Sequence, residues 1–398
     1  MNRKDFIIKG GLASTAILSS GSILANHLNN YKKKVNIAVI GTGNRGGGLI
    51  GFINQIEHLN LIACCDILPF RLEEALKKTN NTAIGYSDYQ KLLANKKIDA
   101  VLIATPFSTH ERITIEAIKA GKHVYCEKTL AKGYEGIQEL VQQVKKSNII
   151  FQTGHQYHSS RLYLHVIDLI KKGKVGKIAS VESQWNRKGD WRRKVSDPSL
   201  EKAINWRMYK EFSGGLTAEL CSHQIDFVNT ILNATPIQVM GAGGIDYWKD
   251  GRETYDNVHL LYTYPEGVKA KYTCLTSNAK DGYQIKVIGD KGTIILTTNT
   301  ANFYPIPNNN KKQDKKQEVD GVSGATKQSD NYEYGEPINI VHEDPSKQAL
   351  IDFSNSILNN KQPISSVFTG AKAAVCVQMA LDAMYNNKIV PWPKHISL

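Results

Sequence analysis

The sequence predicts an α/β protein in which an N-terminal doubly wound parallel sheet is followed by a C-terminal α/β domain with an open, mostly antiparallel sheet. Three observations predict this class. Short apolar strands alternate with helical segments over residues 35–155, as in a parallel sheet with crossover helices. Longer strand segments bounded by turn residues follow over residues 178–296. The chain has 398 residues, which is long for one hydrophobic core, so we expect two domains.

Residues 1–34 have the features of an export leader. Arg3 and Lys4 precede a largely apolar stretch of small residues that ends near Ala25. The start of the chain resembles a twin-arginine signal in which the second arginine is a lysine. We therefore expect a periplasmic protein, with a cytoplasmic enzyme that carries an N-terminal arm as the alternative.

Charge and cysteine content narrow the classes of partner and site. The formal net charge is +13, but the lysines are scattered rather than gathered in one basic stripe. After the leader, no segment has the about 18 continuous apolar residues that a membrane span needs. The six cysteines form no regular framework and no CxxC pair, which argues against structural disulfides and a cysteine zinc site. We expect neither a nucleic-acid partner nor a stable membrane anchor.

The first predicted strand, residues 35–40, runs directly into a glycine-rich turn with GxGxxG spacing that opens a helix. In this setting the first glycine makes the turn, the second lets the backbone approach a pyrophosphate, and the third lets helix and strand pack closely. The free N–H groups of the helix then attract phosphate. The residues of this turn that we expect to bind a cofactor are Gly41, Gly43, Asn44, Arg45 and Gly46.

A second apolar strand, Leu59 to Cys65, ends at Asp66. A carboxylate at this place in a Rossmann domain accepts hydrogen bonds from the ribose hydroxyls of the adenosine half of a dinucleotide, which favours NAD over NADP. NADP remains an alternative cofactor because of Arg71, which either binds a 2′-phosphate or lies on a helix surface. A glycine turn that binds no ligand is the alternative.

The alternation of strands and helices continues to residue 155, where we place the end of this domain. A second domain follows over residues 156–345, in which residues 305–345 are a polar insertion rich in Asn, Lys, Asp, Gln and Gly, and C-terminal helices occupy residues 346–398. Further strands are expected at 100–104, 123–126 and 149–152 in the first domain, and at 178–185, 258–264, 268–276, 284–288 and 293–296 in the second.

Glu127 and Lys128 directly follow the strand at 123–126. They therefore lie at the carboxyl end of a core strand, where open α/β sheets bind their ligands. Hydride transfer from an alcohol needs a base for the hydroxyl proton, since the nicotinamide supplies only half of the chemistry. Lys128 is a candidate proton relay, with an ordinary exposed lysine as the alternative.

A second segment suited to acid–base chemistry lies on a helix predicted over 216–232. Glu219, His223 and Asp226 fall at i, i+4 and i+7, so they share one helical face. A carboxylate one turn from a histidine can orient the imidazole and raise its basicity, which suits a general base near neutral pH. The same triplet could instead bind a metal or form a solvated stripe. We expect no metal.

With these motifs in this order, the chain resembles the glucose–fructose oxidoreductase / inositol dehydrogenase (Gfo/Idh/MocA) family over essentially everything after the leader. The resemblance implies a Rossmann domain and a C-terminal α/β domain whose open sheet carries the substrate and often the oligomer contact. The family's Glu-Lys-Pro motif places its catalytic lysine on Lys128, with Thr129 in place of proline. Its Asp-x-x-x-His motif falls on Glu219 and His223, with glutamate in place of aspartate.

The resemblance also implies roles for residues outside these motifs. Thr105, Pro106 and His110 match the family's turn beside the nicotinamide, and Gly154, His155 and Gln156 match the segment that faces the cofactor from the next strand. The stretch from 185 to 209 is similar to that of exported members associated with carbohydrate metabolism, where aromatic faces stack on sugars and arginines bind hydroxyls. Interdomain packing is the alternative for this stretch. The substrate candidates are Trp191, Arg192, Trp206, Arg207 and Asp226.

Together these features predict an NAD(P)-dependent oxidoreductase acting on CH–OH groups, which transfers a hydride between the nicotinamide and a hydroxyl or keto carbon of a sugar, glycoside or cyclitol. Lys128, His223 and Glu219 are the predicted catalytic residues. We expect a homo-oligomer that holds NAD tightly, because free NAD is scarce outside the cytoplasm. Two alternatives stay open: an NAD-dependent glycosidase that works by transient C3 oxidation, elimination and re-reduction, and a non-catalytic dinucleotide-binding protein.

Overall fold

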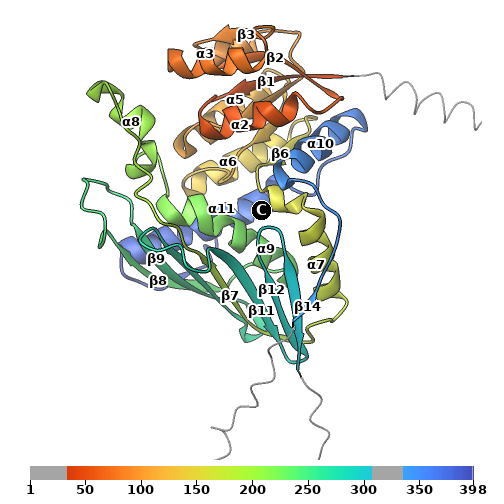
Figure 1. The fold of residues 1–398 in the computed structure, drawn as a ribbon, viewed down its shortest axis with the longest axis vertical. Helices are drawn as coiled ribbons and strands as arrows, with labels where there is room; N and C mark the ends of the chain where they lie inside the picture. Colours follow the sequence, from red (N-terminus) through yellow and green to blue (C-terminus); the bar gives the residue numbers. More distant parts are fainter. Residues whose placement is uncertain (1–33, 307–334, 397) are drawn as a thin grey trace, which may run out of the picture.

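The computed structural model describes residues 34–306, 335–396 and 398. All but the last residue of the predicted leader at 1–34 lies outside the described residues, as do residues 307–334 of the predicted polar insertion. The described part folds around two sheets, one above the other in Figure 1, with helices packed on and between them.

The first sheet has six strands in the order β3-β2-β1-β4-β5-β6, and every neighbouring pair is parallel. This strand order is that of the Rossmann fold and confirms the predicted doubly wound sheet. The strands are β1 Val35–Ile40, β2 Leu59–Cys65, β3 Ile84–Tyr86, β4 Ala100–Ile103, β5 His123–Cys126 and β6 Phe151–Thr153.

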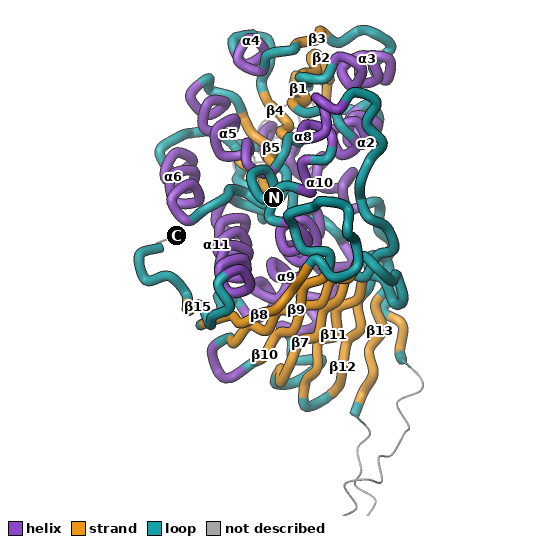
Figure 2. Tube along the Cα trace, turned by 90° about the vertical axis from the view of Figure 1, so that its left-hand side faces the viewer, coloured by secondary structure: helices purple, strands orange, loops and turns teal. Residues whose placement is uncertain are grey.

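Helices cover both faces of this sheet because successive residues of a buried strand point to opposite sides. Ile37 and Val39 of β1 pack with helices α2 and α10, whereas Ala38 and Ile40 belong to the core beneath α5 and α6. Figure 2 shows these two pairs of helices on opposite sides of the strands. The helices around the sheet are α2 Asn44–Ile53, α3 Pro69–Lys78, α4 Tyr89–Leu93, α5 His110–Lys119, α6 Tyr134–Lys145 and α10 Pro345–Leu358.

The second sheet has nine strands in the order β14-β13-β12-β11-β7-β10-β9-β8-β15. Only the β7–β10 pair in it is parallel among the described residues, so the predicted open, mostly antiparallel sheet is confirmed. The strands are β7 Ile178–Trp185, β8 Gln238–Gly244, β9 Asn257–Thr263, β10 Lys269–Leu275, β11 Tyr283–Gly289, β12 Gly292–Leu296, β13 Ala301–Pro305, β14 Glu336–Pro337 and β15 Val390–Pro391.

Helices α9 Ser222–Leu232 and α11 Val367–Tyr385 lie between this sheet and the Rossmann sheet (Figure 2). Helix α7 Arg161–Lys171 packs against α9. By length and composition α11 could cross a membrane, but 72% of its most apolar window is buried inside the protein. It packs against α6, α9 and β8, so its apolar character matches a position in the core.

Short helical turns occupy the remaining connections. Before α9 the chain forms a π-helical turn, η5, rather than the continuous α-helix predicted from 216. The short elements are η1 Phe107–Thr109, η2 Gln156–His158, η3 Pro198–Leu200, α8 Glu201–Ile204, η4 Trp206–Met208, η5 Thr217–Cys221 and η6 Pro265–Gly267.

Candidate active site

The predicted catalytic side chains meet where the carboxyl ends of β5 and β6 face η5 and α9. Lys128, just after β5, donates hydrogen bonds to the carbonyl oxygens of Ala218 and Glu219 in η5, over 3.3 and 3.0 Å. His155, just after β6, meets His223 of α9 with ring centroids 5.7 Å apart. The site is therefore built from both halves of the molecule.

The glycine turn that follows β1 has the geometry that a dinucleotide needs. Gly41 has a φ of +86°, and a Cβ placed on it would lie 2.8 Å from the backbone of Ala104. A Cβ on Gly46 would lie 1.9 Å from the carbonyl oxygen of Gly41. No side chain caps the start of α2, so its first N–H groups are left for an anion. These features fit a pyrophosphate.

Asp66 lies beside the glycine turn, as predicted, but the protein itself uses most of its carboxylate. One oxygen accepts hydrogen bonds from the backbone N–H of Thr42 at 2.8 Å and from its hydroxyl at 3.2 Å. The other accepts from the N–H of Leu68 at 2.9 Å. Since a carboxylate has about four acceptor positions, roughly one remains for a ribose hydroxyl.

The half-buried Arg45 and the buried Glu127 form an ion pair between the start of α2 and the end of β5. The Arg45 Nε lies 2.6 Å from Glu127 Oε1, and its Nη1 donates to the hydroxyl of Ser346 at the start of α10. Burial opposes the charge on Arg45, yet Glu127 holds the pKa of the guanidinium above its usual value. The pair ties three elements together at the mouth of the cofactor region.

Lys128 is buried among polar groups. Beyond its two carbonyl acceptors, its Nζ lies 3.8 Å from Glu219 Oε2. Burial lowers the pKa of the Lys128 ammonium, and the Glu219 and Glu127 carboxylates oppose that shift. The next residue, Thr129, follows a cis peptide bond and donates its hydroxyl to the carbonyl of Ala218. Lys128 is therefore an ammonium group fixed by two hydrogen bonds, and it loses its proton more readily than an exposed lysine does.

Glu219 does not orient His223, which corrects the prediction of a shared helical face. Its carboxylate accepts a 2.8 Å hydrogen bond from Arg207 Nε and faces Lys128 instead. The reason is the π-helical turn, since a wider turn moves Glu219 away from the position it would hold in an α-helix. Burial opposes ionisation, but Lys128 and Arg207 keep the pKa of Glu219 below its usual value.

His223 is buried among rings rather than beside a carboxylate. Tyr157 approaches it edge to face at 5.4 Å, and Trp185 of β7 lies 5.7 Å away at a tilt. Its Nδ1 is buried and has no hydrogen-bond partner among the described residues. Burial, followed by the nearby Lys128, lowers the pKa of His223 well below its usual value. His223 is therefore a neutral imidazole with an available nitrogen.

Two further histidines reach the site: His155, which the resemblance placed in the cofactor-facing segment without a catalytic role, and His158, which was not predicted. Thr153 and His155 share a 2.7 Å hydrogen bond through Nδ1, while Nε2 of His155 is buried without a partner. Burial lowers the pKa of His155 to about 4. His158 binds Asp226 across 2.8 Å, and although burial opposes its charge, Asp226 raises the pKa of His158. Asp226, predicted to meet substrate, is buried in this pair.

The residues predicted to flank the nicotinamide lie at the same sheet edge. The two ring nitrogens of His110 lie 2.8 Å from the carbonyl oxygen of Thr129 and 3.0 Å from that of Thr105. Burial lowers the pKa of His110 and so favours the neutral ring, which has a single N–H and donates it to one of these two carbonyls at a time. Pro106 precedes η1 in the same turn, and the buried Oε1 of Gln156 in η2 has no partner among the described residues.

The predicted substrate residues separate into two groups. Arg207 stacks over the ring of Trp206 at 4.1 Å and reaches Glu219, so this pair adjoins the catalytic cluster. Arg192 instead forms ion pairs with Glu201 and Asp250. Trp191, next to it, has Arg187 over its ring at 5.6 Å. A direct substrate contact by Trp191 or Arg192 stays a prediction.

A metal centre at the Glu219 triplet, the alternative that its spacing left open, is not formed. Among the described residues no three His, Cys, Asp or Glu side chains gather in an arrangement that could hold a metal ion. Glu219, His223 and Asp226 point to different partners, as the contacts above show. All six cysteines are buried and free.

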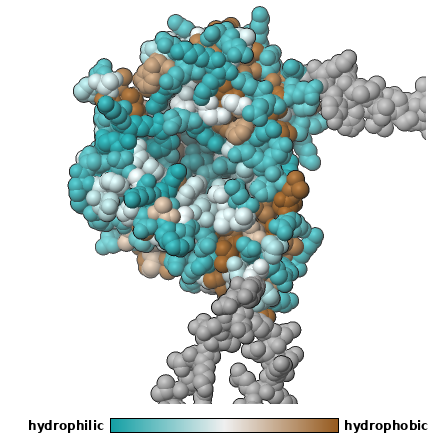
Figure 3. Space-filling view, in the orientation of Figure 1, coloured by the Kyte–Doolittle hydropathy of each residue, from teal (hydrophilic) through white to brown (hydrophobic). Residues whose placement is uncertain are grey.

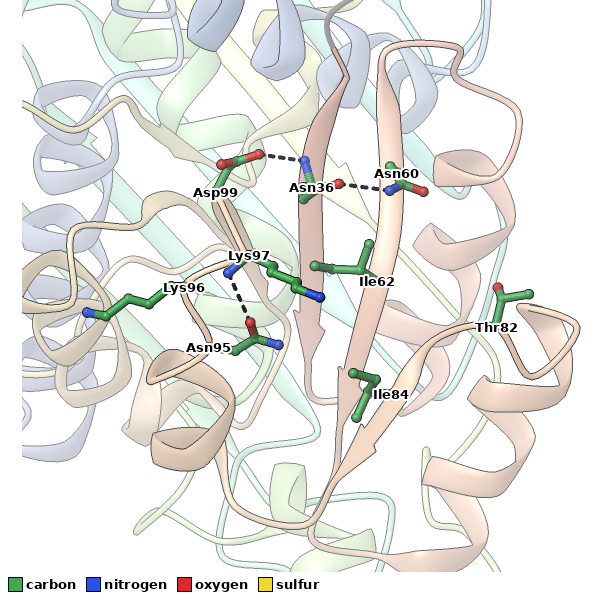
Figure 4. Close-up of a pocket in the computed structure, with 9 residues that line it drawn as sticks. All are labelled: Asn36, Asn60, Ile62, Thr82, Ile84, Asn95, Lys96, Lys97 and Asp99. Atoms are coloured by element: carbon green, nitrogen blue, oxygen red, sulfur yellow. Dashed lines mark hydrogen bonds between the residues drawn. The ribbon is translucent and has the colours of Figure 1, made fainter.

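The face of the molecule in Figure 3 is mostly hydrophilic and is hollowed near its centre, between the two sheets. A cavity of about 560 Å³ lies elsewhere, at the amino ends of β1 and β2 (Figure 4). There Asn36 donates its N–H to Asp99 and accepts from the Asn60 amide. Because ligands of open α/β sheets bind at the carboxyl ends, this cavity is not the candidate site.

Two family models match the chain and together cover most of it. The model of the oxidoreductase family NAD-binding Rossmann fold (GFO_IDH_MocA) matches residues 35–155. The model of the oxidoreductase family C-terminal alpha/beta domain (GFO_IDH_MocA_C) matches residues 167–392.

Individual curated relatives match only about half of the chain. The 2,7-anhydro-N-acetylneuraminate hydratase of Escherichia coli is 30% identical over 210 residues, which is 53% of either chain. The myo-inositol 2-dehydrogenase of Thermotoga maritima is 26% identical over 211 residues, 52% of this chain and 58% of that protein. The match thus spans little more than half the length of these relatives.

Solved structures share the fold over nearly the whole chain. A levoglucosan dehydrogenase in complex with NADH superposes with a TM-score of 0.73 at 18% identity, covering 91% of this chain and 100% of the other. The myo-inositol 2-dehydrogenase from Lactobacillus plantarum gives 0.70 at 19% identity, with the same coverage.

Proposed function

The chain belongs to the Gfo/Idh/MocA family of NAD-binding oxidoreductases, and we propose that it transfers a hydride between NAD(P) and a hydroxyl or keto carbon of a sugar, glycoside or cyclitol. One observation carries the proposal: the buried His223, with an available nitrogen, lies beside the held ammonium of Lys128 at the ligand-binding edge of the Rossmann sheet. Alcohol oxidation requires such a proton acceptor and such a hydrogen-bond donor at the reacting oxygen.

The residues present fit the dinucleotide. The turn from Gly41 to Gly46 would hold the pyrophosphate, and the last acceptor position of Asp66 would meet the adenosine ribose. Once bound, the nicotinamide supplies the hydride acceptor or donor at its C4. We also propose that the leader at 1–34 exports the protein. Because free cofactor is scarce outside the cytoplasm, we then expect NAD or NADP to stay with the protein through purification.

His223 and Lys128 divide the proton chemistry. In oxidation the C–H hydrogen leaves as hydride to the cofactor and the O–H proton moves to the unpartnered Nδ1 of His223. Lys128, kept protonated by Glu219, donates a hydrogen bond to the substrate oxygen as it becomes a carbonyl. Reduction reverses both movements, so the same two side chains serve either direction.

The surroundings of His223 favour a carbohydrate. Trp185, Tyr157 and Tyr283 form an aromatic wall in which Trp185 and Tyr283 pack edge to face at 4.8 Å. Aromatic faces pack well against the C–H faces of a sugar ring, while Arg207 at the edge of the cluster can bind hydroxyls. We propose a small carbohydrate substrate and a homo-oligomer that assembles through the open second sheet.

A second candidate, a glycosidase with no net redox change, is favoured by the second neutral imidazole. Here oxidation at C3 would acidify the C2 proton, a base would remove it, and the electron pair would expel the glycosidic group from C1. Water would then add at C1 and a proton at C2, and reduction at C3 would restore the sugar. His155 has a buried Nε2 without a partner next to His223, so one site offers two separate bases. The similarity to a protein named as a hydratase points the same way.

One experiment tests the proposal and separates the candidates. The purified full chain is analysed by mass spectrometry for retained nicotinamide and is then mixed with a panel of sugars, cyclitols and aryl glycosides. NADH or NADPH formation in proportion to product supports the oxidoreductase, and aglycone release without net NADH supports the glycosidase. A protein that neither retains nor binds a nicotinamide dinucleotide would overturn both.

A further inference from the structure

An arm of the second half of the molecule reaches the cofactor region from outside. We call residues 186–213 the arm; it leaves the end of β7, carries η3, α8 and η4, and returns to η5. In Figure 1 its helix α8 stands level with α2 and below α3 of the Rossmann domain, and Figure 2 shows α8 beside α2. The contacts described above for the glycine turn and for the catalytic side chains assign no role to this arm.

Internal bonds hold the arm in this position. The Arg192 guanidinium binds Glu201 within the arm and Asp250 outside it. The Asn205 side chain accepts from the Arg193 N–H at 2.7 Å and donates to the Arg193 carbonyl at 3.0 Å. The backbone at Arg193 is thus fixed, and its side chain points to the Rossmann turn, where Nη1 donates to Asn44 Oδ1 at 2.6 Å.

A cavity of about 390 Å³ lies between the arm and the glycine turn. Its lining includes Gly43 and Asn44 from the turn. The charged lining residues are Arg71, Glu74 and Lys78 from α3, and Arg193 and Lys194 from the arm. The Arg71 guanidinium lies 3.2 Å from the place that a Cβ on Gly43 would take, so the cavity opens onto the surface that the dinucleotide would occupy.

The four cations of this cavity have no anionic partner in the part of the chain that the structure describes. None of Arg71, Lys78, Arg193 and Lys194 lies within 4.0 Å of a carboxylate oxygen. Burial lowers the pKa of Arg193, and the like charges of Arg207 and Arg71 lower it further. With Glu74 as the one carboxylate in the lining, the four cations leave a net positive charge beside the glycine turn, and an anion that enters is stabilised by it.

We propose that Arg193 and Lys194 bind a phosphate group of the dinucleotide, so that the arm closes the adenosine side of the cofactor site and retains the cofactor. This rests on the proposed function only in that a dinucleotide must bind. A guanidinium can contact phosphate through two N–H groups, and the exposed Lys194 adds a point charge. The phosphate is either part of the pyrophosphate or the 2′-phosphate of NADP, which the probes below distinguish.

The test measures binding rather than turnover. Dissociation constants for ADP-ribose and 2′-phospho-ADP-ribose are determined by calorimetry on the full chain and on Arg193→Ala and Lys194→Ala variants. Each substitution should raise Kd by about 10- to 100-fold, because a hydrogen bond to a charged group is lost. The fraction of protein purified with bound nicotinamide should fall in parallel. The control is Lys202→Ala, which removes an exposed cation of the same arm that pairs with Glu211.

Weaker binding of both probes would assign Arg193 and Lys194 to the pyrophosphate, and weaker binding of only the 2′-phosphorylated probe would assign them to the 2′-phosphate. Unchanged Kd values in both variants, or an equal loss in Lys202→Ala, would overturn the inference while leaving the proposed function standing. Failure of the unaltered protein to bind either probe would overturn both. Equal unfolding temperatures without ligand show that the arm variants fold.

Discussion

His155 and His223 meet edge to face with ring centroids 5.7 Å apart, and each keeps one buried ring nitrogen without a hydrogen-bond partner among the described residues. Buried polar atoms in a folded protein are normally satisfied, so two open nitrogens side by side mark a place prepared for a ligand. Burial lowers the pKa of both imidazoles, which keeps them neutral near pH 7.

His223→Gln should lower kcat for the reactive sugar by about 10²- to 10⁴-fold, the usual contribution of a general base. Dinucleotide affinity should not change, because the proton acceptor makes no contact with the adenosine half. The control is His165→Gln, a half-buried histidine on α7 outside the site. Steady-state kinetics and dinucleotide titration give both readouts, and a kcat equal to that of the control would remove His223 from the mechanism.

The pH profile of kcat/KM should reflect the shifted pKa values of His223 and Lys128. A base must be neutral, and since the pKa of His223 lies well below 6.5, oxidation should persist as the pH falls through 6.5 and be lost only at lower pH. The Lys128 ammonium has a pKa below 10.5, so activity should decline on the alkaline side before pH 10.5. An acid limb at or above pH 6.5 would contradict this assignment.

Glu219→Gln should act through Lys128 rather than on His223. The carboxylate of Glu219 opposes the fall in the pKa of Lys128, so its removal should lower that pKa further and move the alkaline limb to lower pH. The acid limb, which belongs to His223, should stay in place. A shift of the acid limb instead would restore the role of orienting His223 that the sequence predicted.

Much of the fold follows from the sequence because the Rossmann strands are buried on both faces and read as continuous apolar runs. Strand β4, for example, is fully buried over Ala100–Ile103 and was predicted at 100–104. Strand β3 was not predicted, since it has only three residues at the sheet edge and Ile84 is 54% exposed. The arm was not predicted as a structural unit either, because turns of three or four residues leave no periodic pattern.

The candidate site was predicted less completely. Lys128 and His223 lie together as expected. The prediction that Glu219 orients His223 was wrong, because spacing alone does not distinguish a π-helical turn from an α-helix. His155 was placed in the cofactor-facing segment but not as a base, and His158 was not predicted. Both follow β6 at the ligand-binding edge of the sheet, and this position was the signal that could have identified them. Contacts such as His158–Asp226 join residues far apart in sequence and need the fold.

Asp226→Asn should destabilise the protein by about 1–3 kcal/mol, because it leaves His158 buried without its charged partner. The pKa of His158 is raised in the folded state, so the pair's contribution is fully present below the unfolded value of 6.5 and is lost as the pH rises through the raised pKa. Chemical unfolding of both proteins should therefore show a difference that shrinks toward alkaline pH. A difference that grows with pH would argue against the ion pair.

Gly46→Ala should abolish dinucleotide binding, whereas Gly48→Ala, two residues along the same helix, should not. A Cβ at Gly46 would lie 1.9 Å from the carbonyl oxygen of Gly41, so the glycine turn must move away from the start of α2. A Cβ at Gly48 meets nothing within 4 Å and replaces a helical glycine by a better helix former, which should stabilise the fold by about 0.5–1 kcal/mol. Thermal unfolding and the amount of nicotinamide retained after purification measure the two effects.

Since both variants add the same methyl group to α2, loss of the dinucleotide from Gly46→Ala alone would locate the phosphate contact at the turn. Retention of it by Gly46→Ala would mean that the cofactor binds elsewhere.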